Sequence, residues 1–261
     1  MAWPTVDQLK AKGYVNADGK VNTSKKYFIA YVGDYDAASW LYQRTHNIWD
    51  NPDRGKVPLM WCISPILAVR APMAMEYIWE TATENDYFAA ADNGAGYLNP
   101  GMLEEPRPIS GLPSGVEAWA RHNKFHYDRW DLSITGFIID GNGKGMTEKG
   151  VRSYATFSPN GIVPQKPPFT NYAGLYANMP ITRPDASMSD GIQQVINIIG
   201  LHPDFPFYWG RAVLQTPSWY VEVKEGVEKL RPDFAWLTGP EFFELLRMYL
   251  KEGHYNTIVS Q

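Results

Sequence analysis

The feature that most constrains the fold is a repeated alternation between short apolar runs and longer stretches with helical spacing. The runs are rich in β-branched and aromatic residues, which favour strands. The predicted strands are residues 27–32, 57–63, 87–91, 132–140, 207–214 and 234–237. One helix between successive strands is typical of parallel β/α units.

The predicted helices lie between and after these strands, at residues 36–49, 73–81, 115–129, 148–155, 190–199, 219–230 and 240–251. Residues 161–184 are less regular, and no element is assigned there. We count about seven β/α units and expect a closed (β/α) barrel. The barrel forms a single domain, residues 27–261, after a lead-in segment of residues 1–26. No Gly-x-Gly-x-x-Gly follows the first strand, which argues against an open dinucleotide-binding sheet.

Composition excludes several classes of partner. The 261 residues carry a net charge of −4, and no basic run is longer than Lys25-Lys26, so nucleic acid is not an expected partner. No apolar stretch is long enough to span a membrane, and residues 1–4 are not a signal peptide. The single cysteine, Cys62, lies in an apolar run and is expected to be a buried thiol.

Acidic residues follow three of the predicted strands, where the active sites of β/α barrels lie. Asp34 and Asp36 follow the first strand, Asp92 the third, and Asp140 ends the fourth. Two crowded carboxyls push one pKa upward, so one group can donate a proton while the other is an anion. Glycoside hydrolysis needs this division of roles. We therefore take Asp34, Asp36 and Asp92 as candidate catalytic residues.

Each of these residues also has a structural interpretation. Asp36 is placed to cap the helix that follows it, and Asp34 to satisfy amides in a turn. Asp92 could hold its loop as an Asx-turn.

The sequence around Asp92 resembles a known family. Residues 94–100, Gly-Ala-Gly-Tyr-Leu-Asn-Pro, look like the signature of the GxGYxYP family of glycoside hydrolases, with Asn99 in place of the second tyrosine. Residues 33–43, 52–61 and 70–75 also resemble the C-terminal domain of that family, and residues 130–141 and 157–161 match more loosely.

The resemblance implies hydrolysis of a poly- or oligosaccharide by paired carboxylates. The expected substrate-binding residues are Trp40, Trp61, Arg70, Tyr97, Asn99 and Asp140. Trp61 could equally be a core ring, Arg70 a partner in a structural ion pair, Tyr97 a cover for its loop, and Asn99 a backbone partner ahead of Pro100. The alternatives in function are a metal-dependent carbohydrate deacetylase and a non-catalytic carbohydrate-binding domain.

The resemblance also implies a secreted, periplasmic or cell-envelope bacterial protein and a further N-terminal domain. It leaves open whether this chain is a trimmed domain or a natural short form. His122 and His126 have the spacing of a metal pair on one helix face, but they precede the fourth strand and are expected at the floor of the barrel. We therefore expect no metal and no cofactor.

Overall fold

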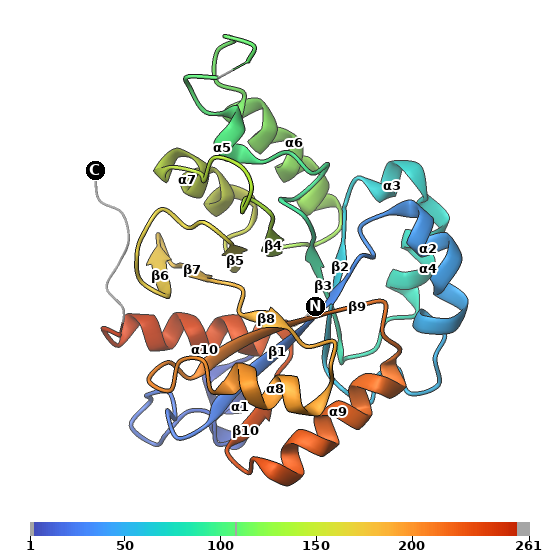
Figure 1. Ribbon diagram of the computed structural model, residues 1–261, viewed down its shortest axis with the longest axis vertical. Coiled ribbons are helices and arrows are strands. Elements are labelled where there is room, and N and C mark those ends of the chain that lie inside the picture. Colours follow the sequence, from blue (N-terminus) through green and yellow to red (C-terminus); the bar gives the residue numbers. More distant parts are fainter. Residues whose placement is uncertain (1–2, 108, 255–261) are drawn as a thin grey trace.

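A computed structural model describes residues 3–107 and 109–254 of the chain. Its helices and strands alternate as the sequence predicts except at residues 161–187, where four strands follow one another without a helix between them (Figure 1). In chain order they are α1 (Val6–Ala11), β1 (Lys26–Gly33), α2 (Ala38–Arg44), a π-helix (Thr45–Trp49), β2 (Leu59–Ile63), α3 (Leu67–Arg70), α4 (Pro72–Glu80), β3 (Asp86–Ala90), α5 (Pro100–Leu103), α6 (Val116–Arg129), β4 (Ile134–Ile138), α7 (Glu148–Phe157), β5 (Gly161–Pro164), β6 (Ala173–Tyr176), β7 (Met179–Thr182), β8 (Ala186–Ser187), α8 (Ile192–Ile199), β9 (Phe207–Val213), α9 (Pro217–Leu230), β10 (Phe234–Trp236) and α10 (Gly239–Lys251).

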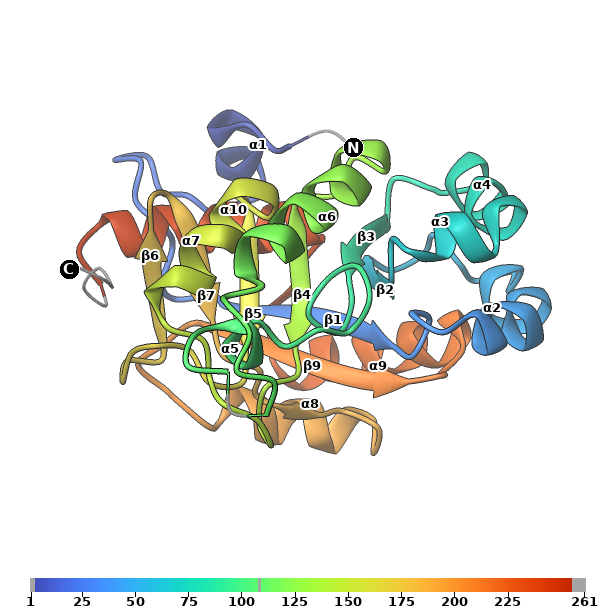
Figure 2. The same ribbon diagram turned by 90° about the horizontal axis from the view of Figure 1, so that it is seen from above.

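The strands form one curled sheet in the order β6-β7-β5-β4-β3-β2-β1-β9-β8, and β10 also pairs with β1. All pairs are parallel except β6 with β7. Seen from above, the row of strands bends strongly (Figure 2). Within the described residues no pairing joins β6 to β8, so the closed barrel of about seven units predicted from the sequence is not confirmed.

Strand β1 pairs with three other strands and carries the first residues of the site at its carboxyl end. Strand β9 pairs with it over most of its length, from Tyr27 to Gly33. The other edge of β1 is divided between two strands, because β10 pairs with Lys26 to Phe28 and β2 with Tyr31 and Val32. Its carboxyl end is therefore flanked by β9 and β2, whose neighbour is β3.

Alternate side chains of β1 enter two different cores, as the period of two in a strand requires. Phe28, Ala30 and Val32 pack with the surrounding helices, whereas Ile29 and Tyr31 face the concave side of the sheet. Helix α10 contributes to the concave core and contacts β6 and β7 at one edge of the sheet as well as β1 and β3, which lie further along it. No helix in the described part of the chain is both long and apolar enough to cross a membrane.

The lead-in segment packs beneath α10. Helix α1 contributes the fully buried Leu9 to the concave core. Lys12 forms an ion pair with Glu241 at 2.5 Å, and the indole nitrogen of Trp3 donates to Glu244 at 2.7 Å. Residues 3–26 are therefore part of the folded body and cover one end of the curled sheet.

The middle of the chain is more regular than its sequence suggests. Strands β6 and β7 form an antiparallel hairpin joined by Ala177 and Asn178. Both loop residues have positive φ, 46° and 70°, which is the conformation of a type I′ turn. Such turns usually contain glycine, and this sequence has none at either position, so the hairpin was not recognised.

A buried ion pair holds β2 and β3 to the loop before β2. The Asp86 side chain is 1 % exposed and lies 2.5 Å from a guanidinium nitrogen of Arg54. Its other oxygen accepts a hydrogen bond from the indole of Trp61 at 2.7 Å. Thr83 donates to the same carboxylate from its backbone and its hydroxyl. The carboxylate is thus fully satisfied, as a buried charge must be.

We expect Arg54→Gln to lower the free energy of unfolding by about 3 kcal/mol or more, because it leaves the Asp86 carboxylate buried without its counter-charge. Urea denaturation measures the loss. Lys56→Gln is the matched control, because Lys56 is 61 % exposed in its pair with Asp53 and its removal should cost little. Equal losses of unfolding free energy in the two variants would contradict a stabilising role for the buried Arg54–Asp86 pair.

Candidate active site

Two of the candidate acids leave their strands in a left-handed backbone conformation. Asp34, directly after β1, has φ 74°, and Asp92, two residues after β3, has φ 40°. Asn93 and Tyr97 in the same loop as Asp92 also have positive φ. Left-handed residues other than glycine are uncommon, and they cluster at functional sites. The strained backbone therefore coincides with the predicted site.

The carboxyl groups of Asp36 and Asp92 meet although they come from different strand ends. The side chains of Asp92 and Asp36 lie within hydrogen-bonding reach, so a proton on Asp92 can form a hydrogen bond to Asp36. Burial, together with this hydrogen bond and the charge of Asp36, raises the pKa of Asp92 to about 8. Asp34 also raises it, while Arg211 lowers it. Asp92 is therefore protonated at neutral pH and can donate a proton.

Tyr97 holds the second carboxyl of this pair. Its hydroxyl donates to Oδ2 of Asp36 and lies 3.0 Å from the backbone oxygen of the same residue. Its ring is half-exposed, at 49 %. Tyr97 therefore does more than cover its loop, because it connects the loop after β3 to the segment after β1. Asp36 does not cap α2, whose N-cap is Ala37 without a side-chain hydrogen bond.

Arg211 joins Asp34 to the opposite side of the site. It lies near the end of β9, and its guanidinium donates to Oδ1 of Asp34 at 2.7 Å. The Nε atom of Arg211 is buried without a protein partner. Sequence reasoning missed this residue, although a lone arginine near the end of the apolar run 207–214 was an available signal.

The loop that carries Asp92 is held by two asparagines. The side chain of Asn93 accepts a hydrogen bond from the backbone of Ile139, just after β4, at 2.7 Å. Asn123 on α6 accepts from the backbone of Ala95 at 2.7 Å. A Cβ atom at Gly94 would lie 2.2 Å from Oδ1 of Asn123, so only glycine fits there. These contacts fix Asp92 relative to β4 and α6.

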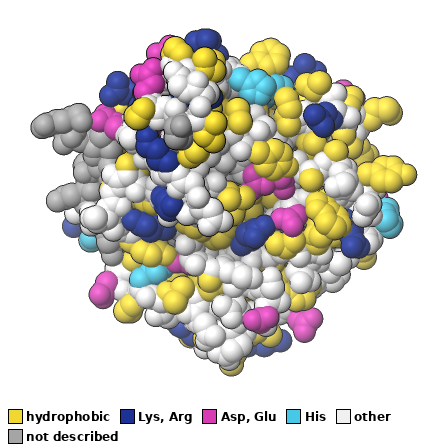
Figure 3. All heavy atoms as spheres, turned by 45° about the horizontal axis from the view of Figure 1, so that its top comes forward, with side chains coloured by type: hydrophobic (Ala, Val, Ile, Leu, Met, Phe, Trp, Pro, Cys, Tyr) yellow, Lys and Arg dark blue, Asp and Glu magenta, His cyan; other side chains and the backbone are white. Residues whose placement is uncertain are grey.

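Two cavities flank the acid cluster. One, of about 370 Å³, is lined by Asp36, Ile66, Arg70 and Tyr97 among others. The second, of about 420 Å³, shares Arg211 with the acid cluster. Its lining residues are Phe137, Gln165, Arg183, Pro184, Asp185, Ala186, Ser187, Trp209 and Arg211. Figure 3 shows acidic and basic side chains next to each other around a hollow on one face of the molecule.

The structure brings only some of the predicted substrate-binding residues to this cluster. Arg70 is exposed and lines the smaller cavity beside Tyr97. Asn99 caps α5 by accepting from the backbone of Gly101 at 2.9 Å, which is the structural role considered for it. Asp140 is 1 % exposed and accepts a hydrogen bond from the backbone of Lys166, while its Oδ2 lacks a protein partner.

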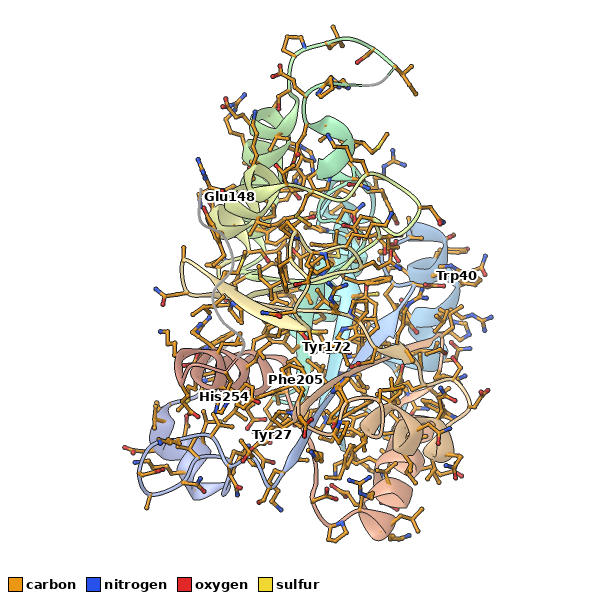
Figure 4. The ribbon with its side chains drawn as sticks, turned by 60° about the vertical axis from the view of Figure 1, so that its left-hand side comes forward. Tyr27, Trp40, Glu148, Tyr172, Phe205 and His254 are labelled. Atoms are coloured by element: carbon orange, nitrogen blue, oxygen red, sulfur yellow. The ribbon has the colours of Figure 1, made fainter. Side chains whose placement is uncertain are left out.

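The two tryptophans lie elsewhere. Trp61 is 1 % exposed and points into the helix layer, where it donates to Asp86, so its ring is not available to a ligand. This is the core placement that its position inside a strand also allowed. Trp40 lies on α2 at the edge of the molecule, with the guanidinium of Arg44 5.7 Å from its ring centre (Figure 4).

The histidine pair lies nearer to the site than the sequence suggests. The ring of His122 contacts the backbone oxygen of Ala95 at 3.1 Å, in the loop beside Asp92. The expected position at the floor of the barrel is therefore wrong for His122, because α6 begins at the rim and His122 lies midway along it. Among residues 3–107 and 109–254, no three His, Cys, Asp or Glu side chains are grouped as metal ligands.

We expect Asp92→Asn to raise the free energy of unfolding at pH 8 and to have no such effect near pH 4. The pKa of Asp92 is about 8 in the folded protein, against about 3.9 in an unfolded chain. The wild type therefore loses stability as the pH rises from the lower to the higher value. Urea unfolding at pH 4, 6 and 8 measures the difference, with the exposed Asp128→Asn as control. A pH-independent difference would contradict the raised pKa.

Comparisons with known proteins agree with this architecture. The model of the GxGYxYP putative glycoside hydrolase C-terminal domain matches residues 24–247. A putative hydrolase from Bacteroides thetaiotaomicron superposes with a TM-score of 0.68 at 17 % identity, over 87 % of this chain but 46 % of that protein. This chain therefore spans less than half of that relative's length.

Weaker similarities connect the chain with other solved structures. The peptidoglycan deacetylase PdaC from Bacillus subtilis has a TM-score of 0.48 at 10 % identity, over 89 % of this chain and 97 % of that one. A putative polysaccharide deacetylase from Mycobacterium smegmatis has a TM-score of 0.48 at 11 % identity, over 91 % of this chain and 95 % of that one. No curated protein matches the chain. The extent of the family match shows that the chain belongs to the family of GxGYxYP putative glycoside hydrolase C-terminal domains.

Proposed function

We propose that this domain hydrolyses a glycosidic bond in a poly- or oligosaccharide, with Asp92 as the general acid and Asp34 as the opposing carboxylate. The observation that carries the proposal is the raised pKa of Asp92, about 8, at the carboxyl edge of the sheet. A carboxylic acid that keeps its proton at neutral pH is what protonation of a leaving-group oxygen requires. Membership of a family named for glycoside hydrolysis supports the same reaction class.

The distance requirement of the reaction distinguishes Asp34 from Asp36. The two carboxyls of a glycosidase lie about 5–5.5 Å apart in retaining enzymes and about 6.5–9.5 Å apart in inverting ones. Asp36 and Asp92 share a hydrogen bond and so lie closer than either arrangement permits. Asp34 is not in that contact, and its carboxylate is held instead by Arg211.

Each remaining group then has a defined task. Asp36 carries the negative charge that helps to keep the proton on Asp92, and Tyr97 holds Asp36 in place. In the reaction, Asp92 donates its proton to the glycosidic oxygen, and the bond to the sugar carbon breaks. Asp34 either takes a proton from the water that attacks that carbon, or attacks the carbon itself. In the second case water, deprotonated by Asp92, then hydrolyses the glycosyl ester and restores both groups. Arg70 and Tyr97 would contact the sugar in the smaller cavity.

Family membership also supports the expectation of a secreted or cell-envelope bacterial protein. It supports an additional N-terminal domain as a partner, in keeping with a relative that is more than twice as long as the matched region. The expected ligand remains a carbohydrate, with no role for nucleic acid or membrane.

The reaction class is tested by substitution. Asp92→Asn and Asp34→Asn should each reduce kcat by about 100-fold or more, the usual contribution of a positioned acid or base. Asp34→Asn should change the melting temperature little, and Asp92→Asn should not lower it, because the neutral amide removes the cost of ionising a buried acid. A panel of plant, host and microbial glycans is incubated with each variant, and released reducing ends are quantified. Asp128→Asn, with an exposed carboxylate paired to Lys124 on α6, is the control and should retain full activity.

The same panel separates the alternatives. Release of acetate without new reducing ends would indicate a deacetylase, for which elemental analysis should then find bound zinc. Glycan affinity without any product would indicate a non-catalytic binding domain. Full turnover in both aspartate variants would contradict the proposed roles.

The role of Asp36 predicts a shift in the pH profile. Activity of the wild type should fall above pH 8, because Asp92 with a pKa of about 8 then loses its proton. Asp36→Asn removes the neighbouring charge, so the same decline should begin at a lower pH. The measurement is kcat/KM from pH 5 to 10 for both proteins. If the fall in kcat/KM above pH 8 is the same in both proteins, the charge of Asp36 does not keep the proton on Asp92.

A further inference from the structure

The larger cavity next to the acid cluster has a cationic wall. Two arginines line it, Arg183 from the segment after β7 and Arg211 from β9. Its volume of about 420 Å³ lies within the range of about 300–1,000 Å³ that is usual for small-ligand sites. Phe137 and Trp209 also line the cavity, but they are only 7 % and 2 % exposed, so little of either ring is open to a ligand.

Arg183 is held in place without using its charge. Its Nε and Nη2 atoms donate to the backbone oxygens of Asn171 and Phe169, at 3.2 and 2.8 Å. Within the described residues it forms no ion pair with a carboxylate. A guanidinium that is fixed along one edge and lacks a counter-ion is available for an anionic ligand.

Arg211 provides the second cation and connects the cavity to the chemistry. One of its nitrogens binds Asp34, and its Nη1 forms no hydrogen bond to another described residue. A ligand in the cavity would therefore contact the same guanidinium that positions the proposed catalytic carboxylate.

The one acidic residue in the lining, Asp185, is turned away from the cavity. Its side chain is 1 % exposed, and Oδ2 accepts the backbone N–H of Trp209 at 2.6 Å. Oδ1 lies 2.7 Å from Nε2 of His202 and also accepts the hydroxyl of Tyr172. Figure 4 shows Tyr172 beside Phe205 in this cluster. Both carboxylate oxygens of Asp185 are thus engaged by donors inside the protein, and neither forms an ion pair with the two arginines.

We propose that this cavity is a subsite for an acidic sugar, a uronic acid whose carboxylate is bound by Arg183 and Arg211. The place of this subsite in the reaction rests on the proposed glycosidase function. The binding of an acidic sugar is argued from the contacts of Arg183 and Arg211 alone. The planar guanidinium matches a carboxylate through two parallel hydrogen bonds. The net charge of the whole chain is −4, so the surface as a whole does not attract polyanions and binding would be local.

The test is a binding measurement in the Asp92→Asn background, which keeps the ligand intact whether or not the protein is a hydrolase. Isothermal titration uses trigalacturonate and cellouronate oligomers, each against the same oligomer with its carboxyl groups reduced to alcohols. We expect the acidic oligomer to bind at least about tenfold more tightly, since hydrogen bonds between charged groups exceed neutral ones. Added salt should reduce this difference in affinity between the acidic and the reduced oligomer, because it screens charges.

Two substitutions locate the binding. Arg183→Gln should remove most of the preference for the acidic oligomer while affinity for the reduced oligomer is unchanged, and Arg183→Lys, which keeps the charge, should retain part of it. Arg121→Gln, at an exposed arginine on α6, is the control. Circular dichroism and melting curves verify folding, because Arg183 also anchors its own segment.

Each outcome decides the proposal. Equal affinity for acidic and reduced oligomers, or no binding of either, overturns the acidic subsite. If the Arg183→Gln variant still prefers the acidic oligomer to the reduced one, the proposed subsite is also overturned. If the acidic oligomers bind as expected but the wild type releases no product from them, the subsite stands and the proposed hydrolysis fails.

Discussion

Two carboxyl groups from different strand ends, those of Asp36 and Asp92, lie within hydrogen-bonding reach, and their contact is favourable only while a proton lies between them. Neither can be ionised beside an ionised partner without a large cost, because both are largely removed from water. The contact therefore determines which acid is protonated at neutral pH. The remainder of the site, Tyr97 on one side and the Asp34–Arg211 pair on the other, is arranged around that shared proton.

The backbone around this contact is held in a conformation that the chain would not adopt alone. The loop after β3 passes through left-handed conformations at Asp92, Asn93 and Tyr97. Each such residue costs about 1–3 kcal/mol unless the surrounding structure supplies compensating contacts. Asn93 and Asn123 supply them by binding the backbone after β4 and within the loop itself. The loop is therefore positioned by its neighbours rather than by its own preference.

The curl of the sheet gives the acids two different surroundings. Asp36 lies beside the smaller cavity, whereas Asp34 is bound to Arg211, which lines the larger one. The two arginines of the larger cavity make its wall positive within a chain that is negative overall.

Much of this arrangement can be predicted from the sequence, because parallel strands place their carboxyl ends at one edge. The alternation of strands and helices, and the position of Asp34, Asp36 and Asp92 directly after strands, follow from local patterns of apolar residues. The glycines around Asp92 likewise indicate a loop with unusual backbone angles. The hairpin of β6 and β7 was missed because its turn residues, Ala177 and Asn178, lack the glycine that usually marks such turns.

Other features depend on contacts that no local pattern contains. The indole of Trp61 finds its hydrogen-bond partner, Asp86, 25 residues away, and the pairing of Asp34 with Arg211 spans 177 residues. The sequence by itself therefore determined the kind of elements, their order and which acids stand at strand ends. Only the tertiary structure decided which acids share a proton and which cation faces them, because the energy of a charge depends on burial and on neighbours brought together by the curl of the sheet.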